Sequence, residues 1–198
     1  MRVDIREETR EYEGFFQLDR VVLRHQRFDG EMSRPVSRLV FERGDSVAVL
    51  LYDSSRDVVV LVEQFRYPAY LREGGEGRLW EVVAGTIEPG RSPYEVARAE
   101  LVEEAGYELQ ELEYLGTFYA SPGACTERIA LFLGQLAYAT RVGSGGGKPG
   151  SSEDIVVHEV SFENALEMVC DGSIRDAKTI IALLQLALRR KKDAVGKH

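Results

Sequence analysis

The sequence has only two cysteines, no long apolar run and fewer basic than acidic residues. Cys125 and Cys170 follow no metal-ligand spacing, and two reduced thiols in a cytosolic protein explain them better than a single disulfide does. No apolar run approaches the length of a membrane span. Residues 1–13 are rich in acids and lack the apolar segment of a secretory signal. We therefore expect a cytoplasmic protein.

The charge balance is negative, with 33 acidic and 25 basic residues and a formal net charge of -8. This balance argues against a partner that is a nucleic acid or an acidic membrane, because such partners need a basic surface. It leaves room for a small anionic substrate, since local arginines or a bound metal can reverse the field within one cleft. A chain of 198 residues that is 44% hydrophobic fits one domain, or one domain with a small appendage.

The chain alternates between strand-like and turn-forming segments. Asp29-Gly30 between the first two strands is a strong hairpin signal, and residues 142–153 are too glycine-rich to be regular, so they indicate a mobile loop. Strands are expected over residues 15–27, 36–42, 46–52, 57–65, 79–83, 112–120, 128–136 and 155–160.

One helix is specified at both ends. Ser92 is a natural N-cap, Pro93 suits the first helical position, and Glu95 completes a capping box. Gly106 stands where a left-handed C-cap residue belongs, so the expected helix runs over residues 93–105. Two more helices are expected over residues 162–170 and 177–190, the second capped by Asp176.

The helix over residues 93–105 carries three acidic residues on one face. Glu100, Glu103 and Glu104 are three and four residues apart, and no basic residue lies among them to relieve their repulsion. Hard cations such as Mg²⁺ bind carboxylate oxygens, so a metal would explain the arrangement. The alternative is a solvated acidic face on a surface helix.

The surrounding sequence resembles the Nudix box, G-x5-E-x7-R-E-U-x-E-E-x-G-U, with U bulky and apolar. The matching segments are Gly85-Thr-Ile-Glu-Pro-Gly90 and Glu100-Leu-Val-Glu103-Glu104-Ala-Gly106-Tyr107. The resemblance implies a loop–helix–loop module that holds catalytic Mg²⁺ or Mn²⁺ against a diphosphate. It implies that Glu100 and Glu104 are the main metal ligands and that Glu103 supports both metal binding and catalysis. The carbonyl of Ala84 resembles a further, backbone ligand.

Two positions depart from the box. Arg91 stands where the family has its first Glu, and Ala99 stands where it has the Arg before the metal-binding Glu. If the missing Glu and Arg support each other electrostatically, losing both is milder than losing one. These departures keep open a weakly active member, or a noncatalytic protein that binds ADP-ribose.

Outside the box, nearly the whole chain resembles the ADP-ribose pyrophosphatase branch of the Nudix superfamily, and GDP-mannose pyrophosphatases share much of the pattern. The resemblance favours a nucleoside diphosphate sugar over a nucleoside triphosphate. The similar segments are Gly14-Phe15-Phe16, Phe41-Glu-Arg-Gly44, Glu63-Gln-Phe-Arg66, Trp80-Glu-Val-Val-Ala-Gly85, Ser121-Pro-Gly123 with Glu127, Glu153-Asp154-Ile155 and Ala177-Lys-Thr179.

Hydrolysis also needs a group that orients or deprotonates water and a group that binds phosphate. Glu153 matches a loop Glu that resembles the base in this branch; the alternative is one more exposed acid. Arg66 is the candidate phosphate ligand, because a guanidinium can contact two phosphate oxygens at once. The alternative for Arg66 is an ordinary surface residue at a strand end.

The resemblance also implies residues for the two ends of the substrate. Phe15 and Arg38 resemble residues that sandwich the base, often from the partner subunit, although Phe15 alone would more often pack in a core or interface. Glu127 is expected at the terminal ribose hydroxyls, with a solvated loop acid as the alternative. Ser121 and Gly123 belong to a turn expected on the substrate side.

The expected fold is an α/β sandwich, with a mixed curved sheet between the Nudix helix and the C-terminal helix. Residues 1–44 should form a small antiparallel β extension for dimerisation and base binding, and residues 45–198 the Nudix domain. Because so short an extension cannot bury its own faces, a homodimer is expected. The predicted reaction converts ADP-ribose to AMP and ribose 5-phosphate, with GDP-mannose or another nucleotide sugar as the alternative substrate.

Overall fold

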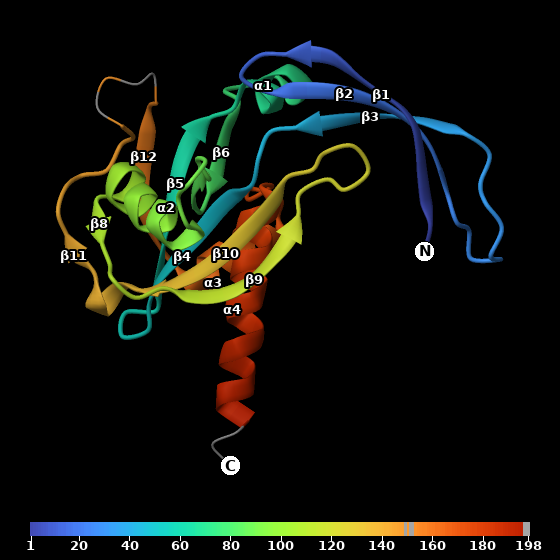
Figure 1. Ribbon diagram of the computed structural model, residues 1–198. Coiled ribbons are helices and arrows are strands. Elements are labelled where there is room, and N and C mark those ends of the chain that lie inside the picture. The colour runs from blue at the N-terminus through green and yellow to red at the C-terminus, as the bar shows by residue number, and fades with distance from the viewer. Residues whose placement is uncertain (149, 151–152, 196–198) are drawn as a thin grey trace. The chain divides into compact units, whose positions relative to one another are not determined.

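A computed structural model describes residues 1–148, 150 and 153–195, with side chains up to residue 192. The chain divides into two compact units. The smaller contains Met1–Asp45 and Phe118–Arg128, and the larger contains Ser46–Thr117 and the chain from Ile129 onward (Figure 1). Within the described part, no helix has both the length and the apolar character needed to cross a membrane.

The smaller unit is built on a three-stranded antiparallel sheet in the order β1-β2-β3. The predicted strands are confirmed as β2 (Gln17–His25) and β3 (Val36–Glu42), and a third strand, β1 (Val3–Glu13), pairs with β2. The sequence does not predict β1, because every residue of it is exposed and its many charges hide any apolar alternation. Phe41 joins the sheet to residues 118–128 by donating its amide to the Ala124 carbonyl at 2.7 Å.

The larger unit contains a mixed sheet in the order β12-β5-β4-β10-β9, with β6 on β5 and β7 on β4. Strands β4 and β10 are parallel, whereas β4 pairs with β5 and β7, and β5 with β6 and β12, in antiparallel register. A separate ladder joins β8 (Tyr107–Glu108) to β11 (Thr140–Arg141). The main strands are β4 (Ser46–Asp53), β5 (Val58–Phe65), β6 (Arg78–Glu81), β7 (Val83–Thr86), β9 (Glu113–Tyr119), β10 (Arg128–Gln135) and β12 (Ile155–Ser161).

The prediction of one strand over residues 79–83 is wrong. The chain leaves β5 after Glu81 and joins β4 at Val83, so two short strands replace the expected one. Between them, the Val82 amide donates to the Thr179 hydroxyl at 2.8 Å instead of to a neighbouring strand. The break places β6 and β7 on different partners.

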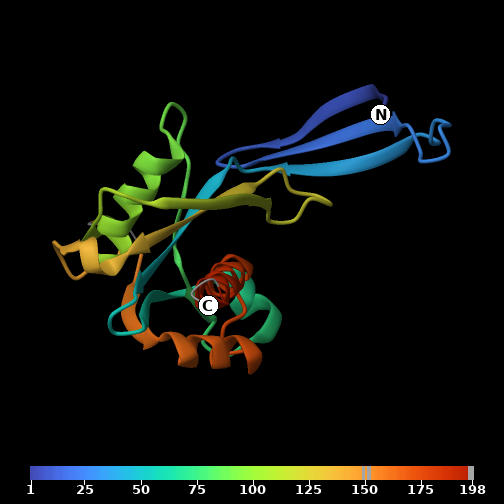
Figure 2. The same cartoon turned by 90° about the horizontal axis from the view of Figure 1, so that it is seen from below.

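Helices cover both faces of the large sheet, as expected for a sandwich (Figure 2). Helix α2 (Pro93–Glu100) packs on β4 and β7, whereas α4 (Ala177–Val195) packs on β4 and β6 and contacts α3 (Phe162–Cys170). Both predicted C-terminal helices are therefore confirmed. Two short helices, α1 (Tyr67–Glu73) and the 3-10 turn η2 (Leu136–Tyr138), were not predicted, and α1 buries none of its residues.

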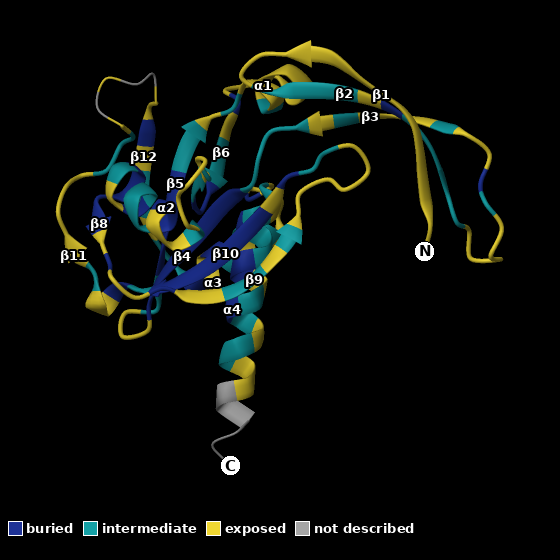
Figure 3. Cartoon of the chain, viewed as in Figure 1, coloured by how far each residue is buried: buried dark blue, intermediate teal, exposed yellow. Residues whose placement is uncertain are grey.

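The core explains why β4 lies at the centre of the sheet. All eight of its residues are buried (Figure 3). Val47, Val49 and Leu51 pack in one apolar cluster with Val96 of α2 and with Leu101, which directly follows α2. Since successive residues of a strand point to opposite faces of the sheet, the intervening residues of β4 point to the face that α4 covers. The sheet thus forms a rigid platform beneath the acidic helix.

Candidate active site

The helix that carries the acidic residues begins as predicted. Ser92 caps it by accepting the Glu95 amide at 3.3 Å, while the Glu95 carboxylate accepts the Ser92 amide at 2.8 Å. Gly106 ends it with a φ of 74°, which confirms the left-handed C-cap. The predicted helix over residues 93–105 is confirmed, and its last turn, Leu101–Ala105 (η1), is a π-helix. Such wider turns occur often at functional sites.

Two carboxylates of this helix face β7. Glu104 is only 6% exposed, and its Oε2 atom accepts the Ala84 amide at 3.1 Å. The Glu100 carboxylate lies so close to Gly85 that a Cβ atom there would stand 2.0 Å from Oε1. A side chain at position 85 would therefore displace the Glu100 carboxylate. Glu103 is half-buried beside them.

The electrostatics of these carboxylates favour a cation. Burial raises the pKa of Glu104 to about 8, with the charges of Glu100 and Glu81 adding to the effect. Burial also raises the pKa of Glu100 to about 7, helped by the charges of Glu103 and Glu153. A divalent cation would relieve both the burial and the repulsion, and carboxylate oxygens suit Mg²⁺. The donor set therefore fits a divalent metal.

The carboxylates do not form a complete set of metal ligands in this structure. Within residues 1–148, 150 and 153–195, no group of three or more His, Cys, Asp or Glu side chains is close enough to hold an ion. Glu104 is turned toward the Ala84 amide, whereas the predicted ligand at Ala84 is its carbonyl oxygen. Metal binding would therefore require these side chains to turn, and the ligand assignments stay predictions.

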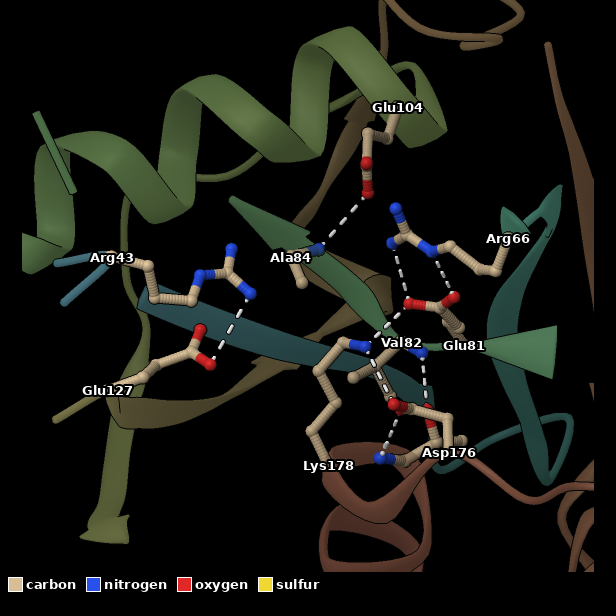
Figure 4. A network of polar contacts seen from close by, with 10 residues as sticks. Arg43, Arg66, Glu81, Val82, Ala84, Glu104, Glu127, Asp176 and Lys178 are labelled. Atoms are coloured by element: carbon tan, nitrogen blue, oxygen red, sulfur yellow. Dashed lines mark hydrogen bonds and ion pairs between the residues drawn. The ribbon is translucent and has the colours of Figure 1, made fainter. Parts of the chain in front are cut away.

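Arg66, the predicted phosphate ligand, lies at the end of β5 and is paired with Glu81 (Figure 4). Its Nε and Nη2 atoms donate to the two Glu81 oxygens at 2.6 and 2.9 Å. Glu81 is 1% exposed, so this pair is desolvated on the carboxylate side. The Arg66 Nη1 atom makes no hydrogen bond with the described residues and remains able to donate to a ligand.

Sequence reasoning missed the partners of Glu81. Lys178 donates to Glu81 Oε2 at 2.5 Å and to Asp176 Oδ1 at 2.8 Å. Asp176 also accepts the Thr179 amide at 3.0 Å, which confirms it as the cap of α4. A signal was available, since an acid directly before Val82 and Val83 in an apolar strand needs a buried partner.

Glu153, the predicted base, follows the glycine-rich loop. Its Oε2 atom accepts the Lys148 amide at 2.8 Å, and its charge helps to raise the pKa of Glu100, which places it near the acidic face. Before it, Gly146 and Gly147 donate their amides to the carbonyls of Glu104 and Glu103, both at 3.0 Å. The glycines thus dock the loop on the π-turn. The expected mobile loop falls partly on residues 149, 151 and 152, which lie outside the described residues.

The residues predicted for the two ends of the substrate belong to the smaller unit. Phe15 is 89% exposed in the turn between β1 and β2, and Arg38 is exposed on β3. Glu127 is buried, and Arg43, which sequence reasoning missed, donates to it at 3.4 Å. The turn that contains Ser121 and Gly123 is exposed. Arg66, Glu153 and the acidic helix belong to the larger unit.

The residue that replaces the first Glu of the box takes part in the local electrostatics. Arg91 donates to Glu88 at 3.4 Å and to the Glu95 carbonyl at 3.3 Å. Its charge lowers the pKa of Glu100, against the larger effect of burial. Arg91 therefore places a positive charge near the acidic face. Ala99, which stands where the family has an Arg, supplies no such charge.

Comparisons with known proteins identify the family of this chain. The ADP-ribose pyrophosphatase of Escherichia coli strain K12 is 42% identical over 180 residues, covering 91% of this chain and 85% of the relative. The GDP-mannose pyrophosphatase of Pectobacterium atrosepticum is 39% identical over 194 residues, covering 98% of both chains. A crystal structure of an ADP compounds hydrolase shares the fold, with a TM-score of 0.75 at 19% identity over 98% of this chain and 96% of the other. The NUDIX domain family matches residues 42–195, and the chain belongs to that family.

Proposed function

We propose that this protein hydrolyses the pyrophosphate bond of a nucleoside diphosphate sugar, and that ADP-ribose gives AMP and ribose 5-phosphate. The observation that carries the proposal is a pair of carboxylates with raised pKa values, the buried Glu104 and the half-buried Glu100, which face Ala84 and Gly85. The 42% identity to an ADP-ribose pyrophosphatase supports the choice of substrate. Nudix hydrolases generally use divalent metal ions, and we propose Mg²⁺ or Mn²⁺ here.

The proposed mechanism assigns one task to each residue. Glu100, Glu104 and Glu103 would hold the metal together with the Ala84 carbonyl; when bound, the metal neutralises phosphate charge and acidifies water. The free edge of Arg66 binds a diphosphate oxygen. Glu153 accepts a proton from the attacking water, whose oxygen forms a new bond to one phosphorus. The bond from that phosphorus to the bridging oxygen breaks, and the leaving phosphate takes its electrons.

The remaining assignments concern the ends of the substrate. We assign Phe15 and Arg38 to the base, Glu127 to the terminal ribose hydroxyls, and Ser121 with Gly123 to the turn on the substrate side. Their exposure, apart from that of Glu127, leaves them accessible to a ligand.

We also propose a homodimer in which the extension of residues 1–44 packs on a second copy, while residues 45–198 form the Nudix domain. The fully exposed β1 supports this assembly, because a three-stranded sheet with such a strand buries little on its own. With a net charge of -8, neither nucleic acid nor an acidic membrane is expected as a partner.

The decisive test is product identification from an equal mixture of ADP-ribose, GDP-mannose and other nucleotide sugars, with Mg²⁺ or Mn²⁺ and with EDTA. We expect AMP from ADP-ribose and no product with EDTA. Glu104→Gln should lower turnover by several orders of magnitude, while Glu111→Gln, which alters an exposed acid, should not. Near-normal activity of Glu104→Gln would contradict the metal assignment.

A second candidate is hydrolysis of GDP-mannose, favoured by the relative that matches 98% of this chain. A clear preference for guanine nucleotides in the same mixture would select it. A noncatalytic ADP-ribose-binding protein is the third candidate, because Arg91 and Ala99 depart from the Nudix box. Calorimetric binding of ADP-ribose without AMP release at saturating Mn²⁺ would select that one.

A further inference from the structure

We propose that Lys178 is a positioning residue for substrate binding: by clamping Glu81 it fixes the direction of the Arg66 guanidinium. The inference rests on the proposed role of Arg66 as a diphosphate ligand. Lys178 lies on α4, outside the Nudix box, and would act only through Glu81. Figure 4 shows Arg66, Glu81 and Lys178 linked in a continuous chain of contacts.

The position of Lys178 is unfavourable for a lysine unless nearby carboxylates compensate it. Its side chain is 14% exposed, and it is the second residue of α4, where the positive end of the helix dipole disfavours a cation. Burying an ammonium group also costs free energy. The carboxylates of Glu81 and Asp176 offset both effects, with Nζ distances of 2.5 and 2.8 Å. The arrangement indicates that Lys178 serves these acids.

The Glu81 carboxylate is fixed by three donors. Oε1 accepts Arg66 Nε, while Oε2 accepts both Arg66 Nη2 and Lys178 Nζ. Because a guanidinium and a carboxylate paired through two hydrogen bonds are nearly coplanar, the plane of Glu81 sets the plane of Arg66. Lys178 approaches one oxygen of this plane and prevents it from turning. The edge of the Arg66 guanidinium that carries Nη1 is then held in one orientation.

Charge balance gives Lys178 a second effect on the same pair. Burial alone would raise the pKa of Glu81, but the hydrogen bonds of Arg66 and the charge of Lys178 hold it below its ordinary value. Two carboxylates, Glu81 and Asp176, face two cations, Arg66 and Lys178. Without Lys178, Arg66 alone would have to neutralise Glu81, and less of its field would reach a bound phosphate.

The start of α4 is itself anchored to the strand that carries Glu81. Asp176 caps the helix and accepts the Thr179 hydroxyl at 2.6 Å, and that hydroxyl accepts the Val82 amide at 2.8 Å. Thr179 is fully buried. The residue after Lys178 is therefore tied to the residue after Glu81, which fixes the first turn of α4, and with it the backbone of Lys178, beside β6.

The test is a double-mutant cycle between Lys178→Met and Glu81→Gln, measured with the nucleotide sugar that the wild-type protein hydrolyses best. Lys178→Met should raise KM about tenfold and lower kcat by less, because a phosphate contact made throughout the reaction contributes uniform binding. Lys178→Arg should recover most of the loss. Lys191→Met, which removes an exposed charge of the same helix, should change neither constant.

The cycle separates positioning from mere packing. If Lys178 acts through Glu81, the double variant Glu81→Gln/Lys178→Met should have the KM of Glu81→Gln alone. Fully multiplicative effects, or an unchanged KM in Lys178→Met, would overturn the proposal. If Lys178→Met does not fold, the double variant still decides the question, since its buried pair is uncharged and is compared with Glu81→Gln.

A failure of the proposed function would be recognised separately. If the wild-type protein hydrolyses no nucleotide sugar, the proposed function is refuted, and the role of Lys178 is then tested by binding instead of by kinetics. Calorimetric titration with ADP in the presence of Ca²⁺ would then test the positioning role directly. Lys178→Met should weaken ADP binding about tenfold, and Lys178→Arg should restore it. Equal affinity of wild type and Lys178→Met would overturn the inference.

Discussion

Replacing Glu104 with Gln should stabilise the metal-free protein at alkaline pH. Glu104 is 6% exposed, and burial raises the pKa of its carboxyl from 4.5 to about 8. A raised pKa means that the folded protein holds the proton more tightly than the unfolded chain does. The stability that the neutral carboxyl contributes is therefore complete below pH 4.5 and is lost as the pH rises toward 8. Glutamine stays neutral throughout and avoids this loss.

The magnitude follows from the two pKa values. Each pH unit between 4.5 and about 8 corresponds to 1.36 kcal/mol, which gives an upper limit of about 5 kcal/mol. A protein of this size gains roughly 2–4 °C in Tm per kcal/mol. Even half of the limit should therefore raise the Tm of Glu104→Gln about 5 °C above wild type at pH 8.5. At pH 4.5 the difference should be much smaller, because the wild-type carboxyl is then mostly protonated.

The assay is thermal unfolding of both proteins with EDTA at pH 4.5 and 8.5, with Glu111→Gln as the exposed control. Adding Mn²⁺ at pH 8.5 should raise the Tm of wild type but not that of Glu104→Gln, since ligands must be deprotonated to bind metal. If wild type and Glu104→Gln show the same change in Tm between the two pH values, the burial reasoning is refuted. If Mn²⁺ stabilises both equally, the metal lies elsewhere.

Two further predictions concern the loop and the departures from the Nudix box. Gly145→Ala should lower kcat at least tenfold with little change in KM. The added Cβ atom would stand 2.2 Å from the Glu104 carbonyl oxygen, and the φ of +70° at this position disfavours any side chain. The control Gly143→Ala, whose added Cβ atom would meet nothing nearer than 3.9 Å, should stay near wild type in steady-state kinetics. Arg91→Glu should tighten Mn²⁺ binding about tenfold in a calorimetric titration, because it replaces a cation beside the acidic face with an anion. Adding Ala99→Arg to this variant should reverse part of the gain, and weaker binding by Arg91→Glu alone would contradict this electrostatic role.

Local signals in the sequence predicted most of the fold, because they depend on neighbouring residues. The capping box at Ser92 and Glu95 and the C-cap at Gly106 fix the helix ends without tertiary contacts. Strand β1 was missed because its pairing with β2, and not its own apolar pattern, makes it a strand. The π-turn was missed as well, since no local pattern of Leu101–Ala105 distinguishes it from an α-helix.

The candidate site divides in the same way. The acidic residues of the helix could be predicted together, because helical spacing places them on one face. The pairing of Arg66 with Glu81 could not, since 15 residues and the return of the chain along β6 separate them. The contribution of Lys178 is more remote still, at 97 residues from Glu81. Such contacts follow from sheet order and helix placement, which one sequence does not encode locally.

The break at Val82 separates two residues with proposed roles in the site, which lie only three positions apart in the chain. Glu81 orients the arginine proposed for phosphate, and Ala84, three residues later, touches a carboxylate proposed for metal. Three residues span at most about 10 Å, and both flanking strands are pinned to separate neighbours. Residues 81–84 therefore fix the distance between the proposed cation site and the Arg66 guanidinium. Lengthening this stretch by one residue would change which anions can touch both at once, even with every functional side chain retained.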